Sequence, residues 1–502
     1  MIQTEITIKK APAYCFKKLD CYLAISTVTG DFYDVSEDTY TALTKWNDEI
    51  VLSIDSITAE QVREMAERYR IPKNIYEKFP LYNAEEKIHD HSHTITHMTD
   101  LTLNITSQCN LQCIYCWNDR GKYSNTTFQK DNQQLHHSRE NMTPRVAKKA
   151  VDILVALCKE DRNLVVDFYG GEPLENLDTL LETVDYCRDN EKRWNVHFHF
   201  LLATNGTLLT PSVAKVLIEK GVQIAISIDG HQQIHDHNRP YANGDGSYHC
   251  IQENLNAMPK EILKRLVGRT TVTPYYADMC ALYAHLKDLG FERIELFESE
   301  DACHMVTPQR EAVFFHTLEQ YQMLCDEYEK LSLLYIDEIL NGTLDYRKTF
   351  FNRFFKLMQR LYYGDELSGG CPAARGQIAV SSTGDIYACT AFIGIDKFKL
   401  GNITEGVDKV LFNNFIDIID RRFDYCQKCD LFAICRTTGS CLNMNYYFNE
   451  NPAIPYQRGC ELFREKLQLA IASLAILKEK IPDQLEALFG YDPVGKRGNE
   501  LY

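Results

Sequence analysis

Three cysteines in one short segment are the residues best suited to chemistry: Cys109, Cys113 and Cys116. Three residues separate the first pair and two separate the second pair. A structural zinc site needs four ligands, commonly arranged as two close pairs. Three thiols in one loop can instead ligate three irons of a [4Fe-4S] cluster and leave the fourth iron without a protein ligand. The spacing therefore predicts a catalytic cluster, with a zinc knuckle as the alternative.

This segment resembles the CxxxCxxC signature of the radical S-adenosylmethionine (SAM) enzymes, including the aromatic residue Tyr115 before the third cysteine. The resemblance implies SAM as a cofactor, chelated to the open iron through its amino and carboxylate groups. It also implies that the reduced cluster passes one electron to the SAM sulfonium. That step would release methionine and a 5′-deoxyadenosyl radical, which abstracts hydrogen from a substrate.

Further segments at the ends of predicted strands are similar to those that line the SAM pocket of this family. Gly170-Gly171-Glu172-Pro173 is like the GGEP motif, with a tight turn before a helix as the alternative. Polar groups at strand ends would supply hydrogen-bond partners for the ribose and the SAM carboxylate. An ordinary salt bridge inside the barrel is the alternative for Arg269. The SAM-contacting residues implied by the resemblance are Tyr115, Gly170, Gly171, Glu172, Asn205, Ser227, Asp229 and Arg269.

Seven more cysteines lie between positions 371 and 460 and resemble the SPASM domain, which carries two auxiliary [4Fe-4S] clusters. With the first triad, the resemblance implies three [4Fe-4S] clusters, and a two-zinc module is the alternative. The ligands implied for auxiliary cluster I are Cys371, Cys389 and Cys441, and those for auxiliary cluster II are Cys426, Cys429, Cys435 and Cys460.

Auxiliary cluster I would thus have three protein ligands rather than four. The nearest upstream cysteine, Cys325, precedes Cys371 by 46 residues, although folding could bring Cys325 or Cys303 close. We therefore expect an open iron that can bind a substrate thiolate, which would lower the thiol pKa and hold the sulfur near a carbon radical.

The residue after the second SPASM cysteine bears on which reaction the enzyme catalyses. Sulfatase-maturing members of the family place an aspartate there as a base, whereas this chain has Thr390 directly after Cys389. Sulfatase maturation is therefore disfavoured. The sequence identifies no catalytic acid or base beyond the cluster ligands.

The elements that must position these residues are strands alternating with helices, which predicts a parallel sheet. The first cysteine triad follows the first strand directly, at the end where barrels of this kind place their active sites. The resemblance selects a partial (β/α)6 TIM-like radical SAM barrel within an α/β fold. Strands are predicted at 101–105, 164–169, 197–203, 222–228, 266–273 and 293–298, and helices include 144–159 and 176–189.

The N-terminal residues 1–85 read as a small α/β unit with strands near 14–18, 21–27 and 31–35. Helices are predicted from Ser36 to Trp46, over 58–69 and over 72–79. This pattern resembles the winged-helix-like leader-binding domain, or RiPP recognition element, of peptide-modifying enzymes. A dimerisation domain is the alternative.

The remaining boundaries follow from these assignments. We predict a linker over 86–100, the radical SAM barrel over 101–305, a helical bridge over 306–365, the SPASM domain over 366–465, and a C-terminal helix and tail over 466–502.

Composition limits the partners. The formal charge of −16 disfavours a nucleic acid, whose phosphates favour a basic surface. The N-terminus lacks the order of a secretory signal, and no apolar run approaches the roughly 20 residues that span a bilayer. We expect a cytoplasmic protein with no membrane partner. Its 18 cysteines are expected to be metal ligands or buried thiols rather than partners in disulfide bonds.

Together these features predict a radical SAM peptide maturase, an oxidoreductase that forms sulfur-to-carbon thioether crosslinks in a ribosomally synthesised precursor peptide, similar to ranthipeptide and sactipeptide maturases. Its partners would be a precursor peptide with a leader sequence and an electron donor such as flavodoxin or ferredoxin. The alternatives are a carbon–carbon crosslinking peptide cyclase and a non-catalytic iron-sulfur protein that carries electrons or scaffolds a partner.

Overall fold

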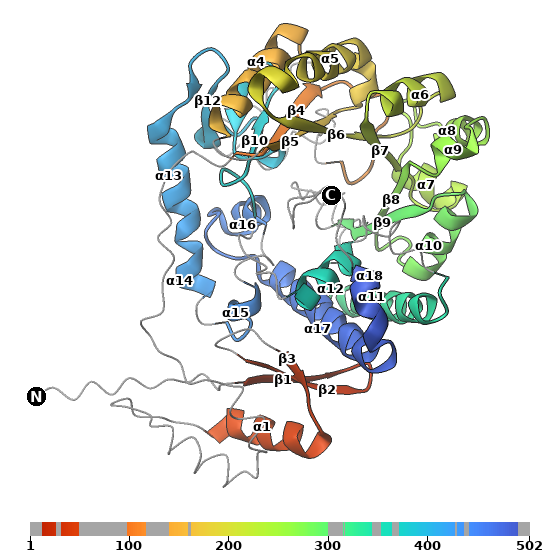
Figure 1. Cartoon of the computed structure of the whole chain (residues 1–502), viewed down its shortest axis with the longest axis vertical. Helices are drawn as coiled ribbons and strands as arrows, with labels where there is room; N and C mark the ends of the chain where they lie inside the picture. The colour runs from red at the N-terminus through yellow and green to blue at the C-terminus, as the bar shows by residue number, and fades with distance from the viewer. Residues whose placement is uncertain are drawn as a thin grey trace, which may run out of the picture.

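The structure is a computed structural model of the 502-residue chain, shown in Figure 1. It describes residues 13–26, 32–49, 98–116, 140–158, 162–299, 315, 317–343, 353–363, 371–426, 429–435 and 441–489. The helices predicted at 58–69 and 72–79, most of the predicted linker, Cys303 and the end of the tail lie outside these residues.

Six parallel strands follow one another in chain order and form an open arc (Figure 1). They are β4 (Asp100–Thr106), β5 (Asn163–Gly170), β6 (His197–Thr204), β7 (Val222–Ser227), β8 (Val267–Val272) and β9 (Arg293–Glu298). Each strand pairs in parallel with the next. The predicted partial (β/α)6 barrel is confirmed, and all six strands begin and end within two residues of their predicted bounds.

The period of two along each strand explains this arrangement, because alternate side chains face the helices and the barrel interior. On β7, Val222, Ile224 and Ile226 join the main hydrophobic core, while Ala225 packs in a separate small cluster. That cluster contains Val165, Leu201 and Val267 from three neighbouring strands. The strands are therefore apolar on both faces near their middle, as expected for a parallel sheet covered by helices.

Helices lie on the outside of the arc. They are α4 (Pro144–Leu157), α5 (Leu177–Trp194), α6 (Pro211–Glu219), α7 (Gln232–Asn238), α8 (Tyr248–Asn256), α9 (Lys260–Leu263) and α10 (Met279–Asp288). Of these, α4, α6 and α10 begin at side-chain caps. The Thr143 side chain accepts a hydrogen bond from the backbone N–H of Val146 at the start of α4. Helix α5 continues past the predicted end at position 189 and stops where Asn195 adopts the left-handed conformation with φ 55°.

The C-terminal strands extend the barrel sheet instead of forming a sheet of their own. Strand β10 (Gln377–Val380) pairs in parallel with β4, and β11 (Asp385–Tyr387), β12 (Lys399–Asn402) and β13 (Gly406–Val407) continue the sheet antiparallel. The short helices after them are α13 (Lys409–Asp420), α14 (Arg422–Cys426), α15 (Phe432–Cys435) and α16 (Leu442–Asn449). The two predicted cysteine-bearing domains thus share one sheet of ten strands.

A group of helices closes the lower side of the arc in Figure 1. It contains α11 (Leu318–Leu340), α12 (Arg353–Tyr363), α17 (Gln457–Lys480) and α18 (Leu485–Phe489). Helix α17 packs against α11, α12 and the N-terminal strands. It carries Cys460 in its first turn and continues without a break across the predicted domain boundary at 465–466.

The N-terminal strands β1 (Ala13–Lys18), β2 (Cys21–Ser26) and β3 (Phe32–Asp34) form an antiparallel sheet, followed by α1 (Glu37–Glu49). The predicted cap is present, because the Ser36 hydroxyl accepts a hydrogen bond from the Thr39 N–H at 3.2 Å. Phe16, Leu23 and Ile25 of this sheet join the main core. The sheet lies beneath α17, on the side of the molecule away from the barrel strands (Figure 1).

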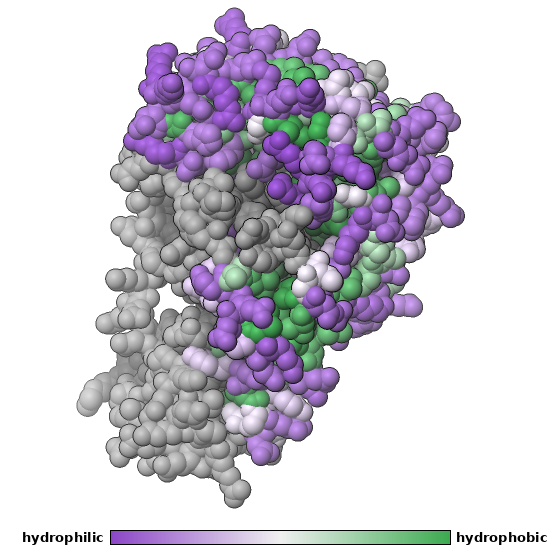
Figure 2. All heavy atoms as spheres, turned by 45° about the vertical axis from the view of Figure 1, so that its right-hand side comes forward, coloured by the Kyte–Doolittle hydropathy of each residue, from purple (hydrophilic) through white to green (hydrophobic). Residues whose placement is uncertain are grey.

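The surface over the barrel helices is largely hydrophilic in the view of Figure 2, and apolar residues appear there in smaller groups. Among the described residues, we find no helix whose length and apolar character would let it cross a lipid bilayer.

Candidate functional site

The first cysteine triad lies in the loop after β4, next to the segment that follows β7. The backbone N–H of Gln112 donates to the Pro240 carbonyl at 2.8 Å, and that of Ile114 donates to the Asn238 carbonyl at 2.9 Å. The Cys113 thiol interacts electrostatically with Cys109 and Cys116, so the predicted three ligands are brought together. Burial is the largest cause that raises the pKa of Cys113, and the nearby charge of Arg239 opposes that rise.

The two glycines after β5 allow the chain to press against the backbone that leads into the triad. The Gly171 N–H donates to the Thr106 carbonyl at 2.7 Å, and the next N–H, of Glu172, donates to the Gln108 carbonyl at 2.7 Å. A Cβ atom at Gly171 would lie 1.8 Å from the Gln108 carbonyl oxygen. At Gly170, φ is 132°, a region that favours glycine. These glycines therefore pack against the backbone of Thr106 and Gln108, and this contact fixes the position of the cysteine loop.

Glu172 is almost completely buried, at 1% exposure, and its carboxylate accepts three hydrogen bonds. The donors are the Thr204 hydroxyl at 2.7 Å and the N–H groups of Asn205 at 2.7 Å and Leu174 at 3.1 Å. Burial raises the pKa of Glu172 to about 7, and the three hydrogen bonds act against that rise. Glu172 thus ties the end of β5 to the end of β6.

Asn205, at the end of β6, points toward the triad. Its side-chain N–H group lies 3.8 Å from the Cys109 sulfur and donates to the Asn110 side-chain oxygen at 2.8 Å. The Asn205 side-chain oxygen accepts from the Thr207 hydroxyl at 2.7 Å, which fixes the orientation of the amide. Asn205 therefore reaches a cluster ligand, a position in which a hydrogen bond to sulfur influences a cluster.

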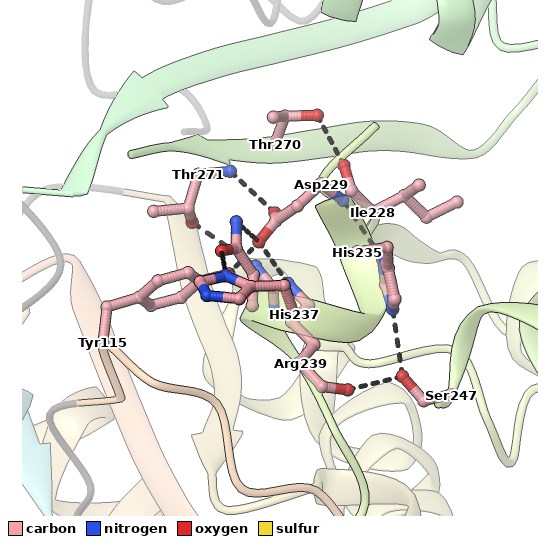
Figure 3. A network of polar contacts seen from close by, with 10 residues as sticks. Tyr115, Ile228, Asp229, His235, His237, Arg239, Ser247, Thr270 and Thr271 are labelled. Atoms are coloured by element: carbon pink, nitrogen blue, oxygen red, sulfur yellow. Dashed lines mark hydrogen bonds and ion pairs between the residues drawn. The ribbon is translucent and has the colours of Figure 1, made fainter. Parts of the chain in front are cut away.

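Asp229, which is fully buried, is the centre of the network in Figure 3. Its carboxylate accepts hydrogen bonds from the Tyr115 hydroxyl, from the Thr271 N–H at 3.0 Å and from the Asn238 side chain at 3.2 Å. Arg239 forms an ion pair with it at 3.1 Å, and the guanidinium carbon lies 5.2 Å from the centre of the Tyr115 ring. The network is buried and joins the cysteine loop to the ends of β7 and β8.

His235 holds the far side of this network and is fully buried. Its Nδ1 accepts from the Asp229 N–H at 3.2 Å, so its Nε2 carries the proton and donates to the Ser247 hydroxyl at 3.0 Å. The Ser247 hydroxyl donates in turn to the Arg239 carbonyl at 2.6 Å (Figure 3). Burial is the main cause that lowers the pKa of His235 to about 4. This neutral histidine therefore positions Asp229 and Arg239.

The two other predicted SAM-contacting residues differ in their surroundings. Ser227 is half-buried at the end of β7. The Arg269 guanidinium forms an ion pair with Glu295 at 2.7 Å, and Glu295 is fully buried. The barrel salt bridge considered for Arg269 is thus present, and the arginine beside the triad is Arg239 instead.

The residues at the ends of β4 and β5 suit a ligand that carries an ammonium group. The side-chain oxygen of Asn104 is buried and has no hydrogen-bond partner among the described residues. It lies 2.2 Å from the position that a Cβ on Gly170 would take, so it faces the glycine turn. A buried acceptor without a donor is costly unless a ligand supplies the donor. The amino group of SAM is such a donor, and these residues therefore fit the implied cofactor.

The later cysteines gather in the two predicted sets. The Cys389 thiol interacts electrostatically with Cys371 and Cys441, and the backbone N–H groups of Ala391 and Phe392 interact with its sulfur. Cys441 is exposed, whereas Cys371 and Cys389 are partly buried. The Cys460 thiol interacts in the same way with the other three thiols of its set, Cys426, Cys429 and Cys435.

Within the described residues, no three His, Cys, Asp or Glu side chains converge closely enough to hold a single metal ion. A [4Fe-4S] cube holds its thiolates apart at separate corners, so grouped thiols that do not converge on one point fit a cluster.

The groups that act most strongly on the Cys325 thiol lie outside the set of Cys371. It lies on α11, where burial raises its pKa to about 11 and the neighbouring groups are Glu465, Tyr321 and Lys18. The arrangement of described cysteines is therefore three thiols in one auxiliary set and four in the other.

Two buried arginines belong to these sites and were not predicted from the sequence. Arg239 directly follows α7 and was assigned no role from the sequence. Arg422 is fully buried at the start of α14, four residues before Cys426. That spacing places both residues on one face of a helix and is a signal that could have identified Arg422.

Known proteins similar to this chain agree with these features. The radical SAM superfamily model matches residues 103–281, and the SPASM iron-sulfur cluster-binding domain model matches residues 371–430. These domains indicate SAM and [4Fe-4S] clusters as cofactors.

Three relatives show how far the similarity extends. A 150-residue segment is 37% identical to an uncharacterized protein of Methanocaldococcus jannaschii and covers 30% of this chain and 45% of that protein, so this chain spans about half the length of that relative. A cysteine-type anaerobic sulfatase-maturating enzyme of Clostridium novyi is 23% identical over 395 residues, which cover 75% of this chain and 96% of the enzyme. The solved structure of native anSMEcpe with bound AdoMet and Cp18Cys peptide has a TM-score of 0.60 at 23% identity and covers 77% of this chain and 100% of its own.

The cysteine triad at the end of β4, the polar strand ends around it, the two later thiol sets and the matching domain models lead to one assignment. This chain carries a radical SAM domain over residues 103–281 and a SPASM iron-sulfur cluster-binding domain over residues 371–430.

Proposed function

We propose that this protein modifies a ribosomally synthesised precursor peptide by joining a cysteine sulfur of the peptide to a carbon atom through a thioether bond. The observation that carries this proposal is the composition of the first auxiliary set, Cys371, Cys389 and Cys441. Among the described residues three thiols form this set, which would leave one corner of a [4Fe-4S] cluster open to a substrate thiolate. Because Cys441 is exposed, a peptide thiol can reach this set from solvent.

The relatives support a peptide as the substrate. The similar enzyme from Clostridium novyi is named for the maturation of a sulfatase, and the anSMEcpe structure contains a bound peptide. A peptide presents a cysteine sulfur and an acceptor carbon on one flexible chain, so both can occupy the same site.

The crosslink removes two hydrogens from the peptide, one from the sulfur and one from the acceptor carbon. SAM and the clusters, when bound, would supply a carbon-centred radical and a place for a peptide thiolate. The carbon loses its hydrogen as an atom to that radical, and the thiol loses its hydrogen as a proton. One electron remains after the S–C bond forms, and an auxiliary cluster, when bound, would supply its acceptor. The electron donor that starts the reaction would be flavodoxin or ferredoxin.

The residues of the chain contribute position and exclusion of water. The Asn104 oxygen and the glycine turn at Gly170 would receive the amino group of SAM. The network of Tyr115, Asp229 and Arg239 would hold the cysteine loop rigid, because each of these polar side chains is buried and hydrogen-bonded or ion-paired. A fixed loop keeps the reacting groups in one geometry, which is a large part of catalysis.

Sulfatase maturation remains disfavoured despite the named relatives. The residue after Cys389 is Thr390, which begins the short turn η5 (Thr390–Phe392). A threonine hydroxyl cannot accept a proton as a carboxylate base does. The position that serves as a base in sulfatase-maturing enzymes is therefore without that function in this chain.

The N-terminal sheet would bind the leader of the precursor peptide. Strand β3 pairs with β2 and is an edge of that sheet in the described residues. An extended peptide can add to such an edge through backbone hydrogen bonds. The sheet is fixed to the catalytic part of the chain by Lys18, which forms ion pairs with Glu465 of α17 and with Glu329 of α11.

Spectroscopy of the auxiliary clusters tests the thioether proposal. The clusters are reconstituted in the C109A/C113A/C116A variant so that the SAM-binding cluster does not contribute. Addition of the cysteine-containing precursor should change the Mössbauer or resonance spectrum of one auxiliary cluster, while the same peptide with serine for cysteine should not. Unchanged spectra with a peptide that the wild-type enzyme processes would contradict the open-iron basis of the proposal.

A further inference from the structure

Arg422 lies near thiols of both auxiliary sets. It is the first residue of α14, and its side chain has 0% exposure. Four thiols act on its charge, and they come from both sets: Cys371 and Cys441 from the first, Cys426 and Cys435 from the second. One guanidinium group thus interacts electrostatically with predicted ligands of two different clusters.

The loop that carries Cys371 is fixed against the start of α14. Arg375 in that loop forms an ion pair with Asp420, the last residue of α13. The guanidinium carbon of Arg375 also lies 5.9 Å from the centre of the Phe423 ring, next to Arg422 in the chain. These contacts hold the loop of Cys371 beside the helix that begins with Arg422 and supplies Cys426.

Negative charge on the neighbouring cysteines would explain why a charged arginine is fully buried at this position. A guanidinium keeps its charge in proteins, and a buried charge is costly without opposite charge nearby. Cysteines that ligate iron are deprotonated, so clusters in both sets would surround Arg422 with negative charge. Its cost of burial would then be offset, and both clusters would gain a nearby cation.

We propose that the charge of Arg422 raises the reduction potentials of both auxiliary clusters. A cation stabilises the reduced form of a cluster, because reduction adds negative charge. The inference rests on the two iron-sulfur sites and not on thioether formation. It holds equally if the peptide product is of another kind.

A second arginine provides a matched comparison. Arg464 on α17 lies with its guanidinium 3.9 Å from the sulfur of Cys429, which belongs to the second set, and its guanidinium carbon lies 5.2 Å from the Tyr14 ring. Among the described contacts, Arg464 reaches thiols of the second set and Arg422 reaches thiols of both. Removal of one charge should therefore move one potential, and removal of the other should move two.

Redox titration followed by electron paramagnetic resonance tests this difference. The full chain with reconstituted clusters is used in the C109A/C113A/C116A background, which leaves the two auxiliary clusters. In R422Q, the reduction equilibrium of both clusters should become at least tenfold less favourable, which is about 59 mV for one electron. In R464Q, one cluster should shift and the other should stay within threefold of the unsubstituted arginine. A tenfold change in only one cluster of R422Q, or in neither, would overturn the proposal.

Iron content per chain is measured for each variant as the control for assembly. If R422Q loses iron, R422K replaces it, because lysine retains the positive charge. Both potentials should then stay within threefold of those with arginine. A tenfold loss in either cluster of a fully loaded R422K protein would show that charge is not the cause and would also overturn the proposal.

Discussion

Tyr115, between the second and third cysteines of the triad, donates a hydrogen bond to Asp229 at the end of β7, 114 residues later in the chain. Asp229 also balances the charge of the buried Arg239. The loop that would hold the SAM-binding cluster is therefore fixed by an ion pair and a phenol that are both inside the barrel. The shape of the cluster site depends on groups that do not ligate iron.

The first prediction compares the two members of this hydrogen bond. D229N should lower the free energy of unfolding by about 3–5 kcal/mol, because it leaves Arg239 as a buried charge without its partner. Y115F removes one neutral donor while Arg239, Asn238 and Thr271 still satisfy Asp229, so it should cost only about 1–2 kcal/mol. Urea unfolding under anaerobic conditions measures both values. Equal losses in the two variants would show that the ion pair does not dominate the network.

The second prediction concerns the glycine turn. G171A should lose the iron of the SAM-binding cluster, because its Cβ would lie 1.8 Å from the Gln108 oxygen and displace the loop before Cys109. G376A is the matched control, since a Cβ there would meet atoms no closer than 3.9 Å. Iron per chain should fall by about four in G171A and stay unchanged in G376A. A G171A protein with a full complement of iron and normal release of 5′-deoxyadenosine would refute the role given to this contact.

The third prediction concerns Asn205. N205A should lower the reduction potential of the SAM-binding cluster, because it removes an N–H group 3.8 Å from the Cys109 sulfur. N254A is the control, since Asn254 donates at 3.1 Å to the carbonyls of Gly206 and Thr207 in the same region and to no sulfur. Redox titration of the cluster signal should separate the two variants. Equal shifts would mean that the region, and not the hydrogen bond to sulfur, sets the potential.

The fourth prediction uses the pH dependence of a buried ion pair outside the cluster sites. Burial alone would raise the pKa of Glu298, but Lys466 and Tyr328 lower it to about 2, from an ordinary value of 4.5. Because the folded pKa is lower than the unfolded one, the stabilisation is complete above pH 4.5 and is lost as the pH falls toward 2. The pair should thus contribute about 3 kcal/mol that disappears over this range.

Unfolding measured at several pH values checks this contribution. K466M should be less stable than wild type at pH 7 and should lose less stability on acidification. K480M is the control, since Lys480 is exposed and pairs with Glu479 at the surface. The assignment fails if K466M and K480M have the same pH dependence.

Much of the fold could be predicted because its signals are local. The six barrel strands are runs of apolar residues whose alternation is visible in the sequence, and β9 was placed at its observed bounds, Arg293–Glu298. The sequence did not predict the pairing of β10 with β4, because these strands lie more than 270 residues apart and the pairing depends on the packed domains.

The described cysteines lie in the groups that their spacing indicated, and their role as iron ligands stays a prediction. The contacts of the residues around these cysteines were not predicted. Arg269 lies near the pocket on β8, and its partner Glu295 lies on β9. The ion pair depends on the register between these two strands, which the sequence does not determine. Arg239 and Arg422 are ordinary charged residues in the sequence, and only the tertiary structure shows that both are buried.

The most direct test of the central claim is the mass of a processed peptide. A cysteine-containing precursor encoded beside the gene is incubated anaerobically with the reconstituted enzyme, SAM and dithionite, and the C113A variant serves as the control. Each crosslink should lower the peptide mass by two hydrogen atoms and leave one cysteine unreactive toward iodoacetamide, while the C113A reaction yields unmodified peptide. A product that loses hydrogen while every cysteine still reacts with iodoacetamide would contradict thioether formation.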